Sequence, residues 1–304
     1  MNLKFAWWSF ALFLLILEGD NAMVLSKVVK EKSHLENVVH PDKGFDHEVM
    51  AETNHENIHS HSTSSPSHMD NSVFVFFTPK DLKVGKVLSV YFRRDSSTPP
   101  HLLPRDEAQL IPFSASELPF LLRIFGFPRG SPQAKAMEDT LRQCELKPIQ
   151  GETKYCATSL ESMLEFVESM LTTKFRGLNT RQMTKAGANH LKNYTIIDEP
   201  REVFAPKMVA CHTMPYPYAV FYCHYQEGES KVFQVMLRGE NNGGELVEAI
   251  AVCHMDTSQW SHNHVSFQVL GIKPGSSPVC HFFPADNLVW VPVFNQQSHG
   301  EMAQ

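Results

Sequence analysis

The sequence lacks several features that would assign it to a common functional class. After residue 17 it has no apolar run long enough to cross a bilayer, which argues against a multispanning membrane protein. Without residues 1–72 it keeps 22 basic and 23 acidic side chains, and this near-neutral balance leaves no basic stripe for nucleic acid. No two cysteines have the spacing of two to four residues that a zinc-finger knuckle uses, which excludes a zinc finger.

The first 22 residues are typical of a secretory signal peptide. Lys4 precedes a 13-residue apolar run from Phe5 to Leu17, which has the length of a signal-peptide core and is short for a membrane span. Cleavage would fall at roughly residues 19–22. An uncleaved anchor is the alternative. We therefore expect residues 1–22 to be a signal peptide and the mature protein to be secreted, with no membrane contact after cleavage.

Residues 23–72 are poor in the side chains that build a core. They contain Phe45 but no Tyr, Trp or Cys, and they carry 7 of the 16 histidines. Such a segment cannot bury enough apolar surface to offset the entropy cost of ordering. We predict a flexible, histidine-rich arm. Its histidines either capture a metal or, in the simpler interpretation, belong to a solvated linker.

All six cysteines are expected to form disulfides, because secreted chains meet an oxidising lumen and six is an even number. Cys144 and Cys156 are close together and predict one local bridge. The other four, which would pair among themselves in an order that the sequence leaves open, are Cys211, Cys223, Cys253 and Cys280.

One sequon, Asn193-Tyr194-Thr195, predicts a glycan on an exposed turn. An unoccupied site is the alternative, since a sequon inside a fast-folding strand is often skipped.

The last third of the chain repeats a Cys-His dipeptide four times, in the pattern CH-x10-CH-x28-CH-x25-CH. In a strand, successive side chains point to opposite faces, so each dipeptide separates its sulfur from its imidazole. If all four lie on neighbouring strands in the same phase, the thiols gather on one side and the imidazoles on the other. The thiols can then form disulfides while the imidazoles converge on a metal.

The distribution of apolar residues predicts an α+β fold over residues 73–294. Two short strands are expected in the segment that starts at Val73, and helices follow. Ser131-Pro132 predicts one helix start, and Thr158 with Glu161 predicts a capping box for another. From about residue 195 onward, short runs rich in Val, Phe and Tyr predict a β-rich half that carries the Cys-His dipeptides and is disulfide-bonded. Residues 295–304 form a C-terminal tail.

This folded region resembles the BURP domain of plant proteins. The resemblance covers roughly residues 73–294 and rests on the four Cys-His dipeptides and on the segments VFFTPKDLKVGK, LPRDEAQLIPFSASELP, GETKYCATSLESM, PYPYAVFYCH, AVCHMDTSQW, FQVLGIKPG and PVCHFFPADNLVWVP. The 28-residue gap lies at the long end of the family's range, as one extra residue in the NNGGE turn would explain. The short arm and the absence of long tandem repeats are similar to the seed-protein class of the family.

The resemblance implies a protein of the plant cell wall, apoplast or storage vacuole. Some BURP domains bind copper through the Cys-His histidines and crosslink Tyr or Trp side chains of a core peptide in their own chain. The copper ligands implied by position are His212, His224, His254 and His281. Imidazole-rich sites suit Cu(II) or Zn(II), and copper is the redox-active choice in an oxidising compartment. His262 and His264 are reserve candidates, and each histidine could instead be a hydrogen-bonded core or turn residue.

Two functional hypotheses follow from these observations. The favoured one is a secreted, glycosylated, disulfide-stabilised protein with a structural or developmental role in the seed or seed-coat wall or apoplast. Its partners would be cell-wall components, and a protein storage vacuole is the alternative location. The other is a copper-dependent oxidative peptide cyclase. Residues 23–72 and 295–304 contain no Tyr or Trp to crosslink, so this enzyme would act on another chain, and no catalytic residue is assigned. A storage role has less support, because the amide-rich bias of storage proteins is absent.

Overall fold

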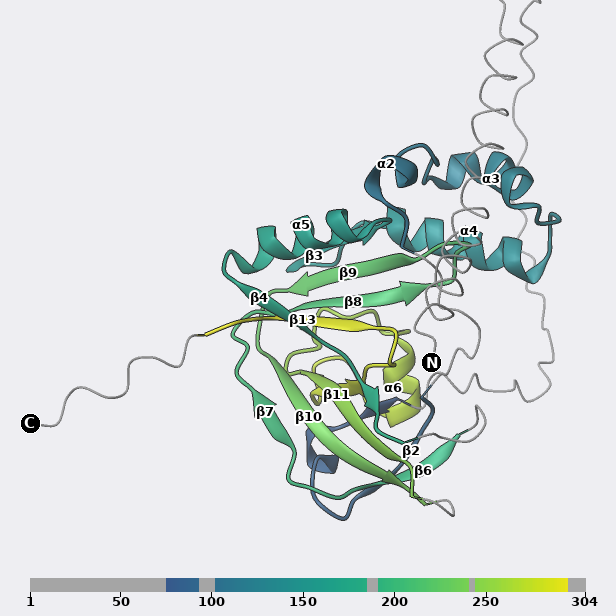
Figure 1. The fold of residues 1–304 in the computed structure, drawn as a ribbon. Coiled ribbons are helices and arrows are strands. Elements are labelled where there is room, and N and C mark those ends of the chain that lie inside the picture. Colours follow the sequence, from purple (N-terminus) through teal and green to yellow (C-terminus); the bar gives the residue numbers. More distant parts are fainter. Residues whose placement is uncertain (1–74, 93–101, 185–190, 241–243, 295–304) are drawn as a thin grey trace, which may run out of the picture. The chain divides into compact units, whose positions relative to one another are not determined.

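A computed structural model describes residues 75–92, 102–184, 191–240 and 244–294 (Figure 1). They belong to a unit that extends from Asp70 to Gln304. The predicted signal peptide, histidine-rich arm and C-terminal tail lie outside the described residues.

Two antiparallel sheets form the framework of the described chain. The smaller sheet has the strand order β3-β9-β8-β13-β4. Its strands are β3 (Glu152–Ala157), β4 (Phe175–Leu178), β8 (Val209–Met214), β9 (Val220–Gln226) and β13 (Leu288–Pro292). The larger sheet has the order β1-β12-β11-β10-β6-β2, with β5 beside β11 and β7 beside β10. Its strands are β1 (Phe76–Phe77), β2 (Val87–Val90), β5 (Arg181–Gln182), β6 (Lys192–Ile196), β7 (Arg201–Val203), β10 (Ser230–Gly239), β11 (Leu246–His254) and β12 (Val279–Phe282).

Helices lie mainly in the first half of this unit, as the predicted α+β class requires. The α-helices are α2 (Arg105–Ala108), α3 (Leu118–Phe125), α4 (Pro132–Glu145), α5 (Leu160–Leu171) and α6 (Val265–Leu270), and two short 3₁₀ helices are η2 (Pro79–Asp81) and η3 (Ala115–Glu117). The predicted start of α4 is confirmed, because the Ser131 hydroxyl accepts a hydrogen bond from the Ala134 N–H and Pro132 is the first helical residue.

Helix α5 covers one face of the smaller sheet (Figure 1). The predicted capping box at Thr158 and Glu161 is wrong by one residue. Ser159 keeps an extended backbone and caps the helix, and its hydroxyl accepts a hydrogen bond from the Ser162 N–H. The buried side chains of α5 recur at every fourth position and pack on the sheet: Met163, Val167 and Leu171.

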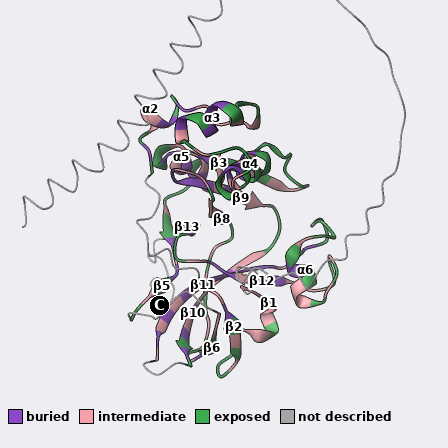
Figure 2. Ribbon diagram, turned by 90° about the vertical axis from the view of Figure 1, so that its right-hand side faces the viewer, coloured by how far each residue is buried: buried purple, intermediate pink, exposed green. Residues whose placement is uncertain are grey.

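The other face of the smaller sheet packs on the larger sheet. The shared core contains Ala210 and Val289 from the smaller sheet and Ile250 and Val252 from the larger one. Buried residues, purple in Figure 2, are dense along β11, whereas α3 carries both buried and exposed residues. The layers are therefore α5, the smaller sheet and the larger sheet (Figure 1).

The first two strands join opposite edges of the larger sheet. β1 pairs with β12, and β2 pairs with β6. The segment between them, which contains Pro79 and η2, connects strands that do not pair with each other. The two strands predicted next to each other in the sequence are thus separated by the whole width of the sheet.

Candidate functional site

The four Cys-His dipeptides form two matching units. Cys211 lies directly opposite Cys223 on β8 and β9, and Cys253 lies directly opposite Cys280 on β11 and β12. Each opposed pair forms a disulfide across two neighbouring antiparallel strands. The third disulfide joins Cys144 of α4 to Cys156 of β3. The prediction that all six cysteines form disulfides, with a local Cys144–Cys156 bridge, is confirmed.

The sulfurs and imidazoles of these units point in opposite directions. Cys211 and Cys223 pack beneath α5, while Cys253 and Cys280 belong to the core on the far side of the larger sheet. The imidazoles face the layer between the sheets. We expected the thiols to gather on one side. They occupy two outer faces instead, because the dipeptides are divided between two stacked sheets.

The four histidines predicted as ligands come together at one end of the inter-sheet layer. Their ring centroids form a chain, with His212–His224 at 5.4 Å, His212–His281 at 5.9 Å and His254–His281 at 5.6 Å. They line a cavity of about 580 Å³ together with Phe76, Glu152, Lys154, Tyr222, Trp260 and His264, among other residues. His254 is buried, and the side chain of His224 is 17% exposed. The imidazoles are thus enclosed by protein but reachable from the cavity.

Of the reserve candidates, His264 joins the cavity and His262 does not. The His264 ring lies 4.6 Å from that of Trp260, which in turn lies 5.0 Å from that of His254. His262 is exposed and does not line the cavity. Nδ1 of His264 accepts a hydrogen bond from the Ser266 N–H at 3.3 Å and lies 2.7 Å from the Ser266 hydroxyl, so this histidine also caps α6.

A buried aromatic ring supports two of the histidines. Phe283 follows β12 directly and has no exposed surface. Its ring stacks on those of His212 and His281, with both centroids at 4.9 Å. This contact fixes the separation between one imidazole of the smaller sheet and one of the larger sheet.

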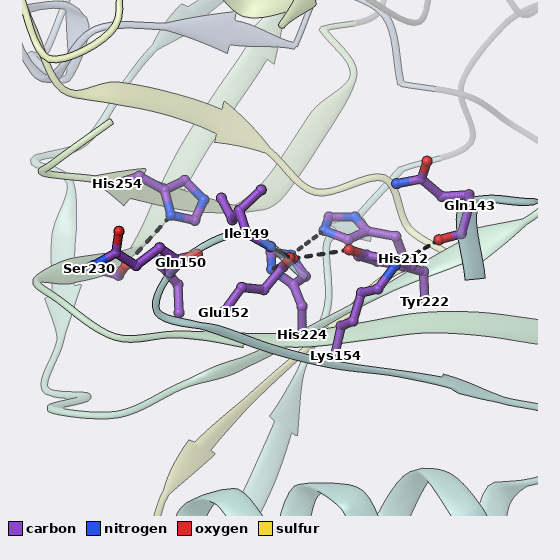
Figure 3. Close-up of polar contacts among 11 residues, drawn as sticks. Gln143, Ile149, Gln150, Glu152, Lys154, His212, Tyr222, His224, Ser230 and His254 are labelled. Carbon is purple, nitrogen blue, oxygen red and sulfur yellow. Dashed lines mark hydrogen bonds and ion pairs between the residues drawn. The ribbon is translucent and has the colours of Figure 1, made fainter. Parts of the chain in front are cut away.

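Glu152 connects His224 to the wall of the cavity (Figure 3). Its Oε1 accepts a hydrogen bond from the Tyr222 hydroxyl at 2.9 Å and lies 3.6 Å from Nδ1 of His224. Its Oε2 accepts from the Ile149 N–H at 3.1 Å. Lys154 lies over the Tyr222 ring, with Nζ 5.3 Å from the centroid, and donates to the Gln143 carbonyl. Burial and the Glu152 carboxylate raise the pKa of Tyr222, so its hydroxyl stays protonated.

Asn287 connects His212 to β8. Its Nδ2 lies 3.2 Å from Nδ1 of His212, and its Oδ1 accepts from the Thr213 N–H at 3.0 Å. Nε2 of His212 is 3.3 Å from Nε2 of His224. Sequence reasoning missed Glu152, Asn287 and Tyr222. All three lie within segments that carry the family resemblance, GETKYCATSLESM, PYPYAVFYCH and PVCHFFPADNLVWVP, and this is the signal that could have pointed to them.

Burial lowers the pKa of all four imidazoles. Desolvation is the largest cause at each one, and the neighbouring imidazoles lower the pKa of His212 and His254 further. The pKa of His281 falls to about 4. The Glu152 carboxylate partly offsets the lowering at His224. All four rings are therefore neutral at pH 7, the form in which imidazole binds a metal.

The donor chemistry of this cavity fits a transition-metal ion, but the rings are not arranged around one point. All six cysteine sulfurs are in disulfides and no described methionine lines the cavity, which leaves neutral imidazole nitrogens as the available donors. The rings of His254 and His281 are nearly parallel, at 12°, so their lone pairs lie in two nearly parallel planes. Across the described ranges, no group of three or more His, Cys, Asp or Glu side chains is placed so that it could hold a metal ion. Binding would require these side chains to rotate.

The sequence profile of the BURP domain matches residues 75–292. This chain belongs to the BURP-domain family. The BURP domain-containing protein BNM2A of Brassica napus is 46% identical over 242 residues, covering 76% of this chain and 84% of that protein. The BURP domain protein USPL1 of Arabidopsis thaliana is 45% identical over 238 residues, covering 76% and 85%. The BURP domain protein RD22 of the same plant is 39% identical over 225 residues, covering 73% and 57%.

Among the described residues, no helix is long and apolar enough to cross a membrane.

The sequon lies on a strand and not on the predicted turn. Asn193 belongs to β6, which pairs with β2 on one side and β10 on the other. Its side chain accepts a hydrogen bond from the Ser89 hydroxyl at 2.7 Å.

Proposed function

We propose that this plant BURP-domain protein is secreted, that its Cys-His histidines hold a copper ion, and that it has a structural or developmental role in the seed or seed-coat wall or apoplast. The observation that carries the proposal is the convergence of four neutral imidazoles on one cavity, contributed by two disulfide-clamped strand pairs. Copper would supply redox chemistry and a strong affinity for imidazole nitrogen.

The protein's own residues would prepare the cavity for the ion. The cross-strand disulfides hold the backbone of each Cys-His pair, and Phe283 packs against the rings of both His212 and His281. Burial keeps the imidazoles free of protons at neutral pH. The Glu152 carboxylate faces Nδ1 of His224, and a carboxylate in this position favours binding of a metal through Nε2.

Secretion is supported by the three disulfides, which form and persist in oxidising compartments. The signal-like residues 1–22 and the exposed sequon at Asn193 point the same way. Cell-wall components are the proposed partners, and a protein storage vacuole is the alternative destination. A tagged protein that stays in the endoplasmic reticulum or cytosol would contradict this part of the proposal.

A second candidate function is oxidative crosslinking of Tyr or Trp side chains in another chain. It is favoured by the cavity, whose volume of about 580 Å³ exceeds that of one aromatic side chain and whose lining includes the exposed Leu146 and Ile149. An apolar peptide segment could dock on these two side chains and present a ring to the imidazoles.

Purified mature protein tests both functions. Metal analysis should find copper that is lost in His254→Ala and His281→Ala, with the exposed His262→Ala as the matched control. Incubation of the copper-loaded protein with Tyr- and Trp-containing peptides, followed by mass spectrometry, tests the crosslinking. Loss of two hydrogens per crosslink, with dioxygen in the assay accepting the two electrons and two protons, would support the second function. Unchanged peptides with bound copper would leave only the first, and equal copper content in all variants would refute the ligand assignment.

A further inference from the structure

Strand β2 is an edge of the larger sheet. Among the described residues it pairs with β6 alone, and it ends the strand order. The Ile196 N–H donates to the Lys86 carbonyl at 2.9 Å, which places Lys86 in a hydrogen-bonded pair just before β2. Such pairs alternate along an antiparallel ladder. The backbone N–H and C=O groups of Val87 and Ser89 therefore point away from β6, off the edge of the sheet.

This edge lacks the devices that natural proteins place on exposed strands. Those devices include charged side chains, prolines and bulges, and β2 reads VLSV. With the next two residues it forms the run VLSVYF, which contains β-forming side chains and no charge, Pro or Gly. Runs of this kind pair readily with an identical run from another chain. Val87 is 43% exposed, so its side chain leaves the edge open to a second copy.

The sequon lies beside this edge, on the face that Val87 and Ser89 share. Val90 of β2 and Tyr194 of β6 pack in the core on the far side of the larger sheet. Side chains alternate along a strand, so Ser89 and Asn193 point to the opposite face. The two are direct partners in the register, and the Ser89 hydroxyl donates to Oδ1 of Asn193 at 2.7 Å.

The hydrogen bond with Ser89 leaves the glycan acceptor free. An N-glycan is attached to the side-chain nitrogen of the asparagine in a sequon. In the part of the chain that the structure describes, this Nδ2 atom of Asn193 has no hydrogen-bond partner, and the residue is exposed. The amide therefore presents its nitrogen to solvent at a distance of one strand from the edge.

The smaller sheet does not cover this part of the face. It packs against Val232 and Ile250, and farther along the same face of β10 the side chain of Arg238 is exposed, with Thr195 as its direct partner on β6. Figure 2 shows β2 and β6 at the end of the larger sheet that lies away from β8 and β9. A glycan on Asn193 thus has room to lie over the face and over β2.

Strand spacing shows what such a glycan would block. An incoming strand would lie one spacing beyond β2, which is about 10 Å from β6. A branched glycan of several sugar rings that begins on β6 extends across β2 into this space. Its hydroxyl groups are hydrated, and excluding their water to let a second strand pair is unfavourable.

We propose that an N-glycan on Asn193 covers the free edge of β2 and prevents a second copy of this chain from pairing with it. The proposal rests on one part of the proposed function, secretion, because the chain must enter the secretory pathway to receive the glycan. It concerns a surface outside the copper cavity, since neither Asn193 nor any residue of β2 lines that cavity.

Secreted protein purified from plant cells tests the proposal. Mass spectrometry should find the glycan on Asn193, and light scattering should give the mass of one chain. Asn193→Gln removes the acceptor and keeps an amide opposite Ser89, and its mass should shift to that of two or more chains. Thr195→Ala removes the sequon without changing Asn193 and should associate in the same way. Thr195→Ser keeps the sequon and is the matched control that should stay monomeric.

Two second-site changes show whether the associating surface is the β2 edge. Added to Asn193→Gln, Val87→Lys places a charge on the edge and should restore the monomer. Met183→Lys places the same charge on an exposed site beside β11 and should leave the association unchanged. Amide hydrogen exchange at Val87 and Ser89 should be fast in the glycosylated monomer and slow in Asn193→Gln, because a second strand would accept from these N–H groups.

The proposal and the proposed function can fail separately. The role of the glycan is refuted if Asn193 is unmodified in the secreted protein, if both variants without a sequon stay monomeric, or if Val87→Lys leaves the association intact. Each of these results leaves the proposed function in place. Secreted protein without copper would contradict the copper site alone, whereas a chain that stays in the cytosol would contradict both proposals. Thermal unfolding checks that each variant is folded.

Discussion

Removing one cross-strand disulfide should separate its contribution to stability from its contribution to the copper site. Cys211–Cys223 and Cys144–Cys156 both join residues 12 positions apart. Loop-closure entropy therefore predicts that replacing either pair by Ala lowers the free energy of unfolding by about 3 kcal/mol. Cys211 and Cys223 are fully buried beneath α5, whereas the other pair is half-buried. Lost packing should add about 1 kcal/mol for each buried sulfur.

The effect on copper should differ more strongly between the two variants. The Cys211–Cys223 bridge holds the two Cα atoms 3.9 Å apart, closer than the usual 4.5 Å or so of such a pair, and the next residue on each strand is a histidine of the cavity. We expect Cys211→Ala/Cys223→Ala to weaken copper binding by about tenfold, and Cys144→Ala/Cys156→Ala by less than about threefold.

Urea unfolding, monitored by tryptophan fluorescence, gives the free energy of unfolding. Competition with a chelator gives the copper affinity. Equal copper affinity in both variants, with the buried pair clearly less stable, would show that the strands hold the imidazoles without the bridge. That result would refute the positioning role of the disulfide.

Three other perturbations test separate parts of the structure. The pKa of His281 is about 4 in the folded protein and about 6.5 when unfolded, so the unfolded chain takes up the proton first. His281 alone should therefore lower the unfolding free energy of the metal-free protein by about 3 kcal/mol as the pH drops from about 6.5 to 4, and His281→Phe should reduce the slope by that amount in pH-dependent urea titrations. Phe283→Leu should cost about 1–2 kcal/mol and broaden the Cu(II) resonance, because both stacked imidazoles lose their support; an unchanged spectrum would contradict this. Glu245→Ala leaves Lys192, whose side chain is 8% exposed, without its 2.8 Å partner, and should cost about 3 kcal/mol with no change in copper affinity; a cost below about 1 kcal/mol would show that water replaces the partner.

The local geometry of the Cys-His dipeptides could be predicted from the sequence, because it depends on adjacency alone. Neighbouring residues on a strand must face opposite ways, and six cysteines in an oxidising compartment should pair. The start of α4 could be predicted too, because it depends only on the adjacent residues Ser131 and Pro132. The cap of α5 differs by one residue, since Thr158 and Ser159 are both good caps and only the backbone decides between them.

Long-range features could not be predicted in this way. Stacking of two sheets sends the disulfides to opposite outer faces, and no local pattern encodes that arrangement. Glu152 and Asn287 meet the histidines because β3 pairs with β9 and β13 pairs with β8. Glu152 and Asn287 are 72 and 75 residues from the histidines that they contact and are ordinary in residue type, so only the fold shows these contacts. The prediction of a turn at Asn193 was wrong because this residue lies on β6, which pairs with β2, more than 100 residues earlier in the chain.

X-ray absorption spectroscopy at the copper edge of the purified mature protein tests the central claim most directly. If the buried disulfide sulfurs face away from the cavity and the imidazoles face into it, the atoms bound to copper are imidazole nitrogens and not sulfur. The copper should then be lost in His254→Ala and His281→Ala. Sulfur in the first shell, or copper retained at wild-type content in both variants, would contradict the account.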